Sequence, residues 1–266
     1  MSTRLDQTFA HLRAKNEGAL VTFLTAGDPS VEHTADLVAL LADSGADIIE
    51  LGIPYSDPLA DGPSIQASSL RALERGVTPP QVLDMVRQAR ERSDIPLVLM
   101  TSYNLVLRHG LERFALEAHD AGADGAILTD LPPEEAGHWK QAADVRGLAT
   151  IFLVAPTSTP ARIRMAADSA TGFVYCVSRT GVTGARAEMA AELREFLSQV
   201  RTATDKPLCV GFGISTPEHV REVVGMADGA VIGSALVDFL HHNADNPDQD
   251  AALRALVGSW KEATRR

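Results

Sequence analysis

Short apolar runs rich in β-branched residues alternate along the chain with longer segments whose apolar residues recur at helical spacing. The longer segments include VEHTADLVALLADSG at 31–45 and PEHVREVVGMA at 217–227. Because short apolar runs bounded by turn residues predict buried strands, and a 3.6-residue apolar period predicts amphipathic helices, we expect strands and helices to alternate. The expected strands lie at 19–27, 47–54, 96–102, 124–130, 149–156, 173–178, 207–213 and 229–234.

Strict alternation of strands and helices predicts a parallel sheet. Eight such units that close on themselves form a (β/α)8 TIM barrel, which spans about 250 residues, and the chain has 266. We therefore expect an α/β fold with a single TIM-barrel domain over residues 1–266. The alternative is an open doubly wound sheet, but the glycine-rich Rossmann fingerprint is missing after the first expected strand.

Three similar segments mark the junctions between expected helices and strands. They are SGAD at 44–47, AGAD at 121–124 and MADG at 226–229. In each, a glycine or another small residue closes the helix and an aspartate meets the strand entrance. Ordinary turn chemistry is enough to explain this pattern.

The composition, 45% hydrophobic and 22% charged, is that of a globular protein. No apolar run approaches the roughly 18 residues of a membrane span, and the first residues lack the apolar core of a signal peptide. Cys176 and Cys209 both lie in apolar strand-like runs, which indicates reduced packing residues rather than a disulfide framework. We expect a cytoplasmic protein.

The net charge of -11 argues against nucleic acid as a partner. Binding to phosphate backbones needs clustered Lys and Arg side chains. The aromatic fraction of 5% is also too small for a surface that stacks bases.

Glu50 stands between apolar residues in the second expected strand. Side chains of a barrel strand alternate between the interior and the helix layer, so Ile48, Glu50 and Gly52 share one face. The opposite face is fully apolar and belongs under the helices, which directs Glu50 inward, near the C-terminal end of the barrel where active sites are built. The alternative is a structural ion pair inside the barrel.

The loop at 54–63 that follows this strand carries Asp57 and Asp61 close to prolines, which suggests a fixed shape. Asp61 and Glu50 at one barrel mouth make a candidate acid/base pair, because burial raises the pKa of a carboxyl toward a catalytically useful range. An N-cap of the helix that begins near Pro63 explains Asp61 equally well. Asp57 is also plausible as a turn residue.

Glycines at the ends of the last three strands predict a phosphate site. They occur in SRTGVTGARAE, GFGIS and IGSA. Glycine lets backbone N–H groups approach an anion, and a helix N-terminus adds its positive dipole end. Loops after strands seven and eight are the usual phosphate position in this fold. The segment at 179–189 is also polar, contains glycines and is long enough to form a lid.

The sequence lacks the residues that two other kinds of aldolase need, those that form a Schiff base and those that use a metal ion. A Schiff-base aldolase needs a lysine at the barrel mouth, but the chain has four lysines, Lys15, Lys140, Lys206 and Lys261, none at a strand's C-terminal end. A metal aldolase needs clustered imidazoles, yet the eight histidines fall on helices or loops away from those ends. Metal-free acid/base chemistry on a phosphorylated substrate remains.

The chain resembles the tryptophan synthase α chain in LVTFLTAGDP, IIELGIPYSDPLADGPSIQ, the DLP of TDLPPEE, YCVSRTGVTGAR, GFGIS and IGSA, in that order. The resemblance implies a lyase of L-tryptophan biosynthesis. It implies retro-aldol cleavage of indole-3-glycerol phosphate to indole and glyceraldehyde 3-phosphate, with no cofactor in this chain. It also implies an α2β2 heterotetramer, in which indole passes to a β chain that holds pyridoxal phosphate.

The resemblance also implies roles for residues that match the family's motifs. Glu50 matches the general acid/base at indole C3, and Asp61 matches the carboxylate that holds the indole N–H. Asp57 falls where the family contacts its β chain, and Ser102 stands where many relatives have tyrosine. The matching pocket residues are Tyr175 as lining, Phe23, Met100, Leu128 and Ile151 or Leu153 as indole contacts, Gly184, Phe212, Gly213, Gly233 and Ser234 at the phosphate, and Thr183 on the lid.

Two rival functions stay open at this point. One is a free-standing lyase that releases indole without a β chain. The other is a noncatalytic barrel that only activates a partner.

Overall fold

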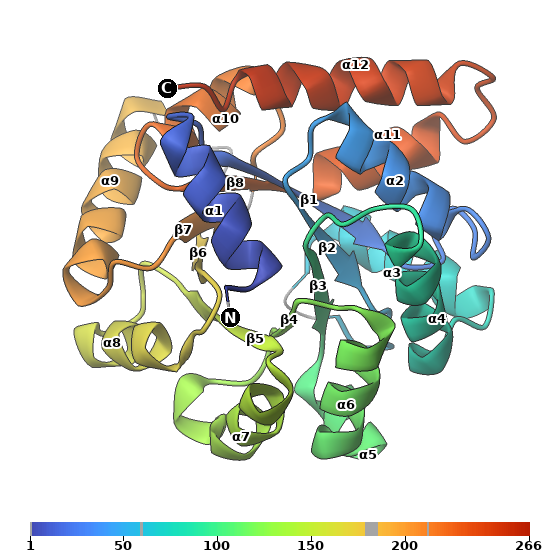
Figure 1. Ribbon diagram of the computed structural model, residues 1–266. Helices are drawn as coiled ribbons and strands as arrows, with labels where there is room; N and C mark the ends of the chain where they lie inside the picture. Colours follow the sequence, from blue (N-terminus) through green and yellow to red (C-terminus); the bar gives the residue numbers. More distant parts are fainter. Residues whose placement is uncertain (1, 59–60, 179–185, 212) are drawn as a thin grey trace.

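Within the residues that the computed structural model describes, 2–58, 61–178, 186–211 and 213–266, eight parallel strands close into a barrel that helices surround (Figure 1). Each strand pairs with its neighbours in sequence, and β8 pairs with β1. The predicted TIM barrel is therefore confirmed. The strands are β1 (Ala19–Thr25), β2 (Ile48–Gly52), β3 (Leu97–Thr101), β4 (Gly125–Leu128), β5 (Ala149–Val154), β6 (Val174–Val177), β7 (Leu208–Gly211) and β8 (Gly229–Ile232).

Apart from α1, the helices form a ring outside the strands. Two α-helices follow each of β2, β3 and β8, and a short 3-10 helix and an α-helix follow β4. None of the helices in the described ranges is long and apolar enough to cross a membrane. The helices are α1 (Arg4–Ala14), α2 (Thr34–Ser44), α3 (Pro63–Glu74), α4 (Pro79–Arg90), α5 (Tyr103–His109), α6 (Leu111–Ala121), the short 3-10 helix η1 (Pro133–Glu135), α7 (Gly137–Arg146), α8 (Pro160–Ser169), α9 (Arg186–Ala203), α10 (Pro217–Val224), α11 (Ser234–His242) and α12 (Gln249–Glu262).

Helix α1 covers one end of the barrel (Figure 1). Its apolar face carries Leu5, Phe9 and Leu12, which pack into the same buried cluster as the inward-facing residues of the strands. Phe9 meets Phe173 edge to face with ring centroids 6.1 Å apart. Because α1 closes the N-terminal end of the strands, access to the barrel interior is left at their C-terminal ends.

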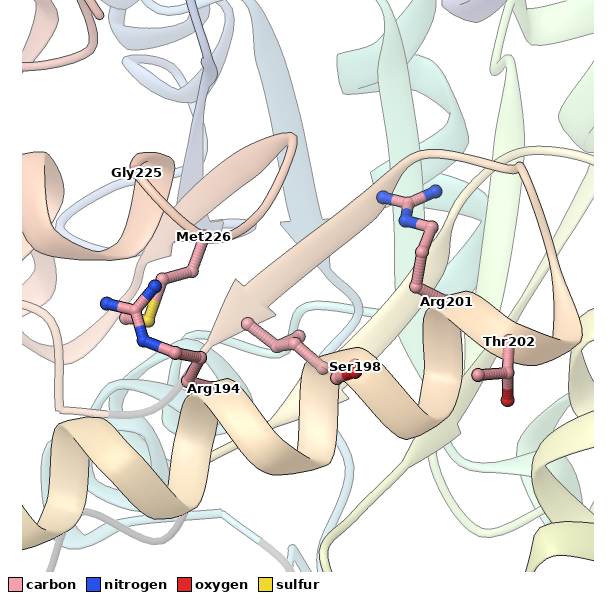
Figure 2. A pocket seen from close by; sticks show the side chains of 7 residues that line it. Arg194, Ser198, Arg201, Thr202, Gly225 and Met226 are labelled. Carbon is pink, nitrogen blue, oxygen red and sulfur yellow. The ribbon is translucent and has the colours of Figure 1, made fainter.

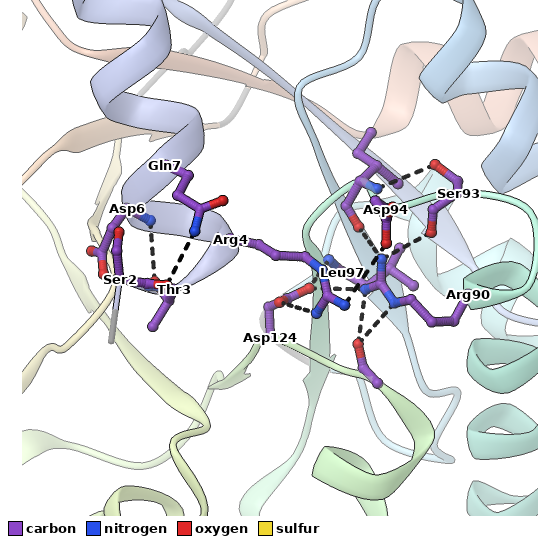
Figure 3. A network of polar contacts seen from close by, with 12 residues as sticks. Ser2, Thr3, Arg4, Asp6, Gln7, Arg90, Ser93, Asp94, Leu97 and Asp124 are labelled. Atoms are coloured by element: carbon purple, nitrogen blue, oxygen red, sulfur yellow. Dashed lines mark hydrogen bonds and ion pairs between the residues drawn. The ribbon is translucent and has the colours of Figure 1, made fainter.

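Three aspartates tie the N-terminal ends of neighbouring strands together. Asp124 accepts the backbone N–H of Leu97 at 2.9 Å and donates its own N–H to the Leu97 carbonyl at 2.8 Å. Arg90 and Arg4 pair with the same carboxylate at 2.9 and 3.0 Å (Figure 3). Matching contacts join Asp47 to Leu20 and Lys261, and Asp228 to Leu208 and Arg201. The repeated Asp of the sequence is thus a strand-to-strand tie as well as a turn residue.

Candidate active site

A cavity of about 110 Å³ lies at the C-terminal ends of the strands. It is enclosed by side chains from β1, β2, β3, β6 and β8 and by the loops that follow β2, β7 and β8. Its lining residues are Phe23, Glu50, Asp61, Gly62, Ile65, Met100, Tyr175, Gly213, Ile214, Val231, Gly233 and Ser234. Residues singled out at six separate places in the sequence therefore surround one space.

Glu50 faces this cavity from β2, as the alternation of the strand predicts. The residue is 1% exposed, and neither carboxyl oxygen has a hydrogen-bond partner among the described residues. Loss of hydration disfavours the charged form of a carboxyl, and burial raises the pKa of Glu50 to about 8. No cation in the described part of the chain pairs with Glu50, which argues against a structural ion pair. With a pKa of about 8, the Glu50 carboxyl is mainly protonated at neutral pH.

Two strand glycines make room for the aromatic residues of the cavity. A Cβ atom on Gly52 would lie 2.6 Å from the Phe23 ring, and one on Gly211 would overlap the Tyr175 hydroxyl. Real side chains do not approach so closely, so each ring lies over the backbone of the adjacent strand. The space that Gly52 leaves beside Glu50 is thus occupied by Phe23.

Asp61 is half-buried at the cavity, and it does not cap α3. The N-cap of that helix is Gly62, and no described side chain forms a capping hydrogen bond there. The Tyr55 hydroxyl lies 3.5 Å from Asp61 Oδ2 and donates to it. Burial raises the pKa of Asp61, and the Tyr55 hydrogen bond lowers it. Asp61 therefore offers its carboxylate to the cavity rather than to the helix.

Asp57 is exposed and does not line the cavity. Its carboxylate accepts a hydrogen bond from the neighbouring Ser56 hydroxyl at 2.6 Å. The structure separates the two loop aspartates, since Asp61 turns to the cavity and Asp57 to the surface.

The glycine-bearing loops after β7 and β8 meet the cavity at the N-terminus of α11. Gly233 is the N-cap of this helix and Ser234 its first residue. Gly213 has φ of 72°, a left-handed conformation that favours glycine. All three residues line the cavity, and a helix N-terminus attracts anions. Thr183, Gly184 and Phe212, together with residues 179–185 of the expected lid, lie outside the described residues.

The expected indole contacts divide into two groups. Phe23 and Met100 line the cavity, whereas Leu128, Ile151 and Leu153 do not. The prediction for Leu128 is wrong, because its side chain packs in the cluster under the helices while its neighbour Ile127 faces the barrel interior. Ile151 and Leu153 pack in the interior, outside the cavity lining.

Several lining residues are not evident from the sequence. Ile65, Ile214 and Val231 complete the apolar wall. An apolar residue in the first turn of the helix after the Asp61 loop is the one signal that points to Ile65. Ser102 does not line the cavity, and its hydroxyl donates a hydrogen bond to Asp130 at 2.9 Å.

Two larger grooves lined by described residues lie elsewhere on the surface. One, of about 430 Å³, runs between α9 and the end of α10 and carries Arg194 and Arg201 (Figure 2). Arg201 is already bound to Asp228 and to the Lys206 carbonyl. The other, of about 530 Å³, lies beside α1. Neither groove contains a buried carboxyl that lacks a partner, because Asp47 beside α1 is paired with Lys261. No three His, Cys, Asp or Glu side chains in the described ranges are grouped to hold a metal ion.

Comparison with known proteins agrees with this geometry. The family model of the tryptophan synthase alpha chain matches residues 9–265. The chain belongs to the tryptophan synthase alpha chain family. Accordingly it is a lyase that cleaves indole-3-glycerol phosphate in tryptophan biosynthesis.

Individual tryptophan synthase alpha chains match over most of their length. That of Geobacter sulfurreducens is 55% identical over 235 residues, which cover 88% of this chain and 89% of the relative. That of Solibacter usitatus is 48% identical over 97% of both chains. The crystal structure of tryptophan synthase subunit alpha from Legionella pneumophila superimposes with a TM-score of 0.92, at 38% identity and 99% coverage of both chains. Tryptophan synthase from M. tuberculosis, in its open form, gives a TM-score of 0.89 at 36% identity.

Proposed function

We propose that Glu50 and Asp61 carry the cleavage of indole-3-glycerol phosphate in this cavity. The observation that supports this most directly is the isolation of Glu50, which is fully buried, without a described partner, and open to the cavity. A structural carboxyl would be paired, because an uncompensated buried acid destabilises the fold. A proton donor near neutral pH instead benefits from a raised pKa.

In the proposed reaction, protonated Glu50 gives its proton to indole C3. The bond between C3 and the glycerol side chain then breaks, and its electron pair returns to the indole ring. The hydroxyl on the departing carbon loses its proton to the Glu50 carboxylate, and that carbon becomes the aldehyde of glyceraldehyde 3-phosphate. Glu50 ends protonated, as it began.

Asp61 supports the step at the other side of the ring. While C3 is protonated, positive charge develops on the indole nitrogen, and a carboxylate that accepts the N–H stabilises that charge. Phe23, Met100 and Tyr175 provide the apolar and aromatic walls that hold a flat ring.

The substrate phosphate is proposed to bind at the N-terminus of α11, against Gly213, Gly233 and Ser234. Backbone N–H groups and the helix dipole supply the attraction. Family resemblance adds Gly184 and Phe212 to this site and Thr183 to a lid that meets Asp61. We propose these roles for Gly184, Phe212 and Thr183 from the family resemblance alone.

We further propose that the chain works with a tryptophan synthase β chain in an α2β2 heterotetramer. Family membership supports a β partner, with pyridoxal phosphate in that partner. Asp57 supports the place of contact, because it is exposed at the barrel mouth and has no task in the cavity. A cytoplasmic setting is part of the same proposal, since Cys176 and Cys209 are buried free thiols.

An assay of indole release tests this function and separates the rivals. The isolated chain is expected to cleave indole-3-glycerol phosphate slowly, and added β chain is expected to raise the rate at least about tenfold, equivalent to about 1.4 kcal/mol of coupling. A chain indifferent to β chain is a free-standing lyase. A chain that never releases indole but still stimulates the β reaction is a noncatalytic activator.

Asp57→Ala tests the contact itself. The variant should lose most of the activation by β chain and keep the basal rate of the isolated chain. Asp94→Ala is the matched control, because the Asp94 side chain is 96% exposed near Arg4, away from the cavity. Equal loss with and without β chain would place Asp57 in the catalytic site and contradict its role as a contact.

A further inference from the structure

Tyr55 is a residue of the sequence motif around Glu50 that the proposed reaction does not use. It follows β2 by three residues, is half-buried, and lines a small pocket that shares Phe23, Asp61, Ile65 and Met100 with the cavity. Its hydroxyl lies 3.5 Å from Asp61 Oδ2 and 3.5 Å from Thr129 Oγ1. No other side chain in the described ranges donates a hydrogen bond to the Asp61 carboxylate, nor does any form an ion pair with it.

A phenol has one proton to donate, so the three oxygens allow two arrangements. In the first, Thr129 donates to Tyr55 and Tyr55 donates to Asp61. In the second, Thr129 donates to the Thr101 carbonyl, 3.4 Å away, and Tyr55 donates to Thr129. An ionised Asp61 selects the first arrangement, because a hydrogen bond to a charged acceptor is stronger than one to a neutral hydroxyl.

The charges around Asp61 give this hydrogen bond its importance. Burial raises the pKa of Asp61, and the Tyr55 hydroxyl is the one described group that lowers it. The other titratable groups of the site are acidic: Glu50 on β2, Tyr175 on β6 and Asp130 after β4. Since none of the described residues places a cation in contact with Asp61, a single neutral donor favours its carboxylate form.

The backbone of Asp61 is held by a separate contact. The Gln66 side-chain amide donates to the Asp61 carbonyl at 2.8 Å and to the Pro58 carbonyl at 3.3 Å. Removal of the Tyr55 hydroxyl alone therefore releases the carboxylate and leaves the backbone tie in place.

We propose that Tyr55 is a positioning residue that aims the Asp61 carboxylate at the indole N–H, with Thr129 orienting the Tyr55 proton. The inference rests on the proposed role of Asp61. It predicts that this chain depends on a hydroxyl at position 55 although that hydroxyl takes no part in proton transfer to the substrate.

Tyr55→Phe removes the hydroxyl and keeps the ring. We expect kcat/KM for cleavage to fall about tenfold, which corresponds to about 1.4 kcal/mol and lies at the lower end for a hydrogen bond to a charged group. The acidic limb of the kcat/KM profile should move to higher pH, because Asp61 loses the donor that favours its ionised form. Binding of glycerol 3-phosphate should stay within twofold of wild type, since the phosphate groups are untouched.

Tyr103→Phe is the matched control. Tyr103 begins α5 after β3, and its hydroxyl has no hydrogen bond among the described residues. This variant should keep both kcat/KM and the position of the acidic limb. Wild-type values for Tyr55→Phe in both measurements would overturn the inference. So would parallel losses of cleavage, phosphate binding and thermal midpoint, which would show that the hydroxyl only supports packing.

Asp61→Asn and the double variant separate this inference from the proposed function. If Asp61→Asn cleaves normally, the proposed role of Asp61 fails, and the role of Tyr55 fails with it. If Asp61→Asn is severely impaired while Tyr55→Phe is normal, only the role of Tyr55 fails. In the Asp61→Asn background, adding Tyr55→Phe should cost less than about twofold, because residues that act through one contact are not additive.

Discussion

Replacement of Glu50 by Gln keeps the shape of the side chain and removes its titration. In the folded chain, burial raises the pKa of Glu50 from its usual 4.5 to about 8. Because the folded state holds this proton more tightly than the unfolded state, the stabilising contribution is fully present below pH 4.5 and is lost as pH rises through about 8. A glutamine side chain has no such dependence, so the variant should gain stability relative to wild type as pH rises.

The size of the effect follows from the two pKa values. Each pH unit between them costs the wild-type chain about 1.4 kcal/mol relative to the variant. Between pH 5 and pH 7.5 the difference in free energy of unfolding, variant minus wild type, should grow by about 3 kcal/mol. Urea unfolding of both chains across this range measures it. Glu91→Gln, at an exposed position, is the control and should show no comparable growth.

The same variant should lose cleavage by at least about 10²-fold, since general acid/base catalysis contributes about 10² to 10⁴. A chain that becomes more stable at neutral pH and less active is the expected result. A stability difference that stays constant with pH would show that Glu50 is already ionised at neutral pH. That result would refute the argument that burial raises the pKa of Glu50. Normal turnover by the variant would show that Glu50 is a structural residue.

Three further variants test other parts of the site and the barrel. Asp61→Asn should lower cleavage by about 10² or more in a steady-state assay, because a neutral amide stabilises the charged indole nitrogen less well; unchanged cleavage would remove Asp61 from the mechanism. Gly213→Val should weaken glycerol 3-phosphate binding, because valine strains the left-handed backbone at φ of 72°. Indole binding should be largely unchanged. Calorimetry measures both affinities, and equal loss of both ligands would indicate misfolding. Asp124→Ala should lower the free energy of unfolding by about 3 kcal/mol, because the partly buried Arg90 loses its carboxylate partner and the Leu97 N–H loses its acceptor. The exposed Asp94→Ala should change it by less than about 0.5 kcal/mol, and equal effects would show that the tie contributes nothing.

The order of strands and the inward direction of Glu50 follow from local pattern, and for that reason the sequence predicts both correctly. Each strand is a compact apolar run. In the second strand one face is fully apolar and the other contains Glu50, so the apolar face is expected under the helices and Glu50 inside the barrel. The fourth strand shows where this reasoning stops. Ile127 and Leu128 are both apolar, so their directions are set by the pairing of Met100 with Ile127 across β3 and β4. That register depends on the closed barrel and cannot be predicted from the four residues of β4 alone.

Contacts between distant elements are the other part that pattern does not reveal. The spacing of Asp61 fits both a helix cap and a cavity residue, and only the path of the loop distinguishes them. The partners of the strand-entrance aspartates, such as Arg90 and Lys261, come from helices whose neighbours are decided by tertiary packing. Local sequence specifies the elements, and their mutual placement specifies the site.

The placement of the Phe23 ring over Gly52 constrains the order in which this wall of the cavity can change. A side chain at position 52 would meet the ring at 2.6 Å, so Gly52→Ala arising first passes through an overpacked intermediate. A smaller residue at position 23 arising first leaves only a void, which position 52 can later fill from the adjacent strand. Of the two mutational orders toward a reshaped cavity, the one that begins at position 23 therefore avoids the steric clash, and lineages that widen or shift this wall should carry the change at 23 before the change at 52.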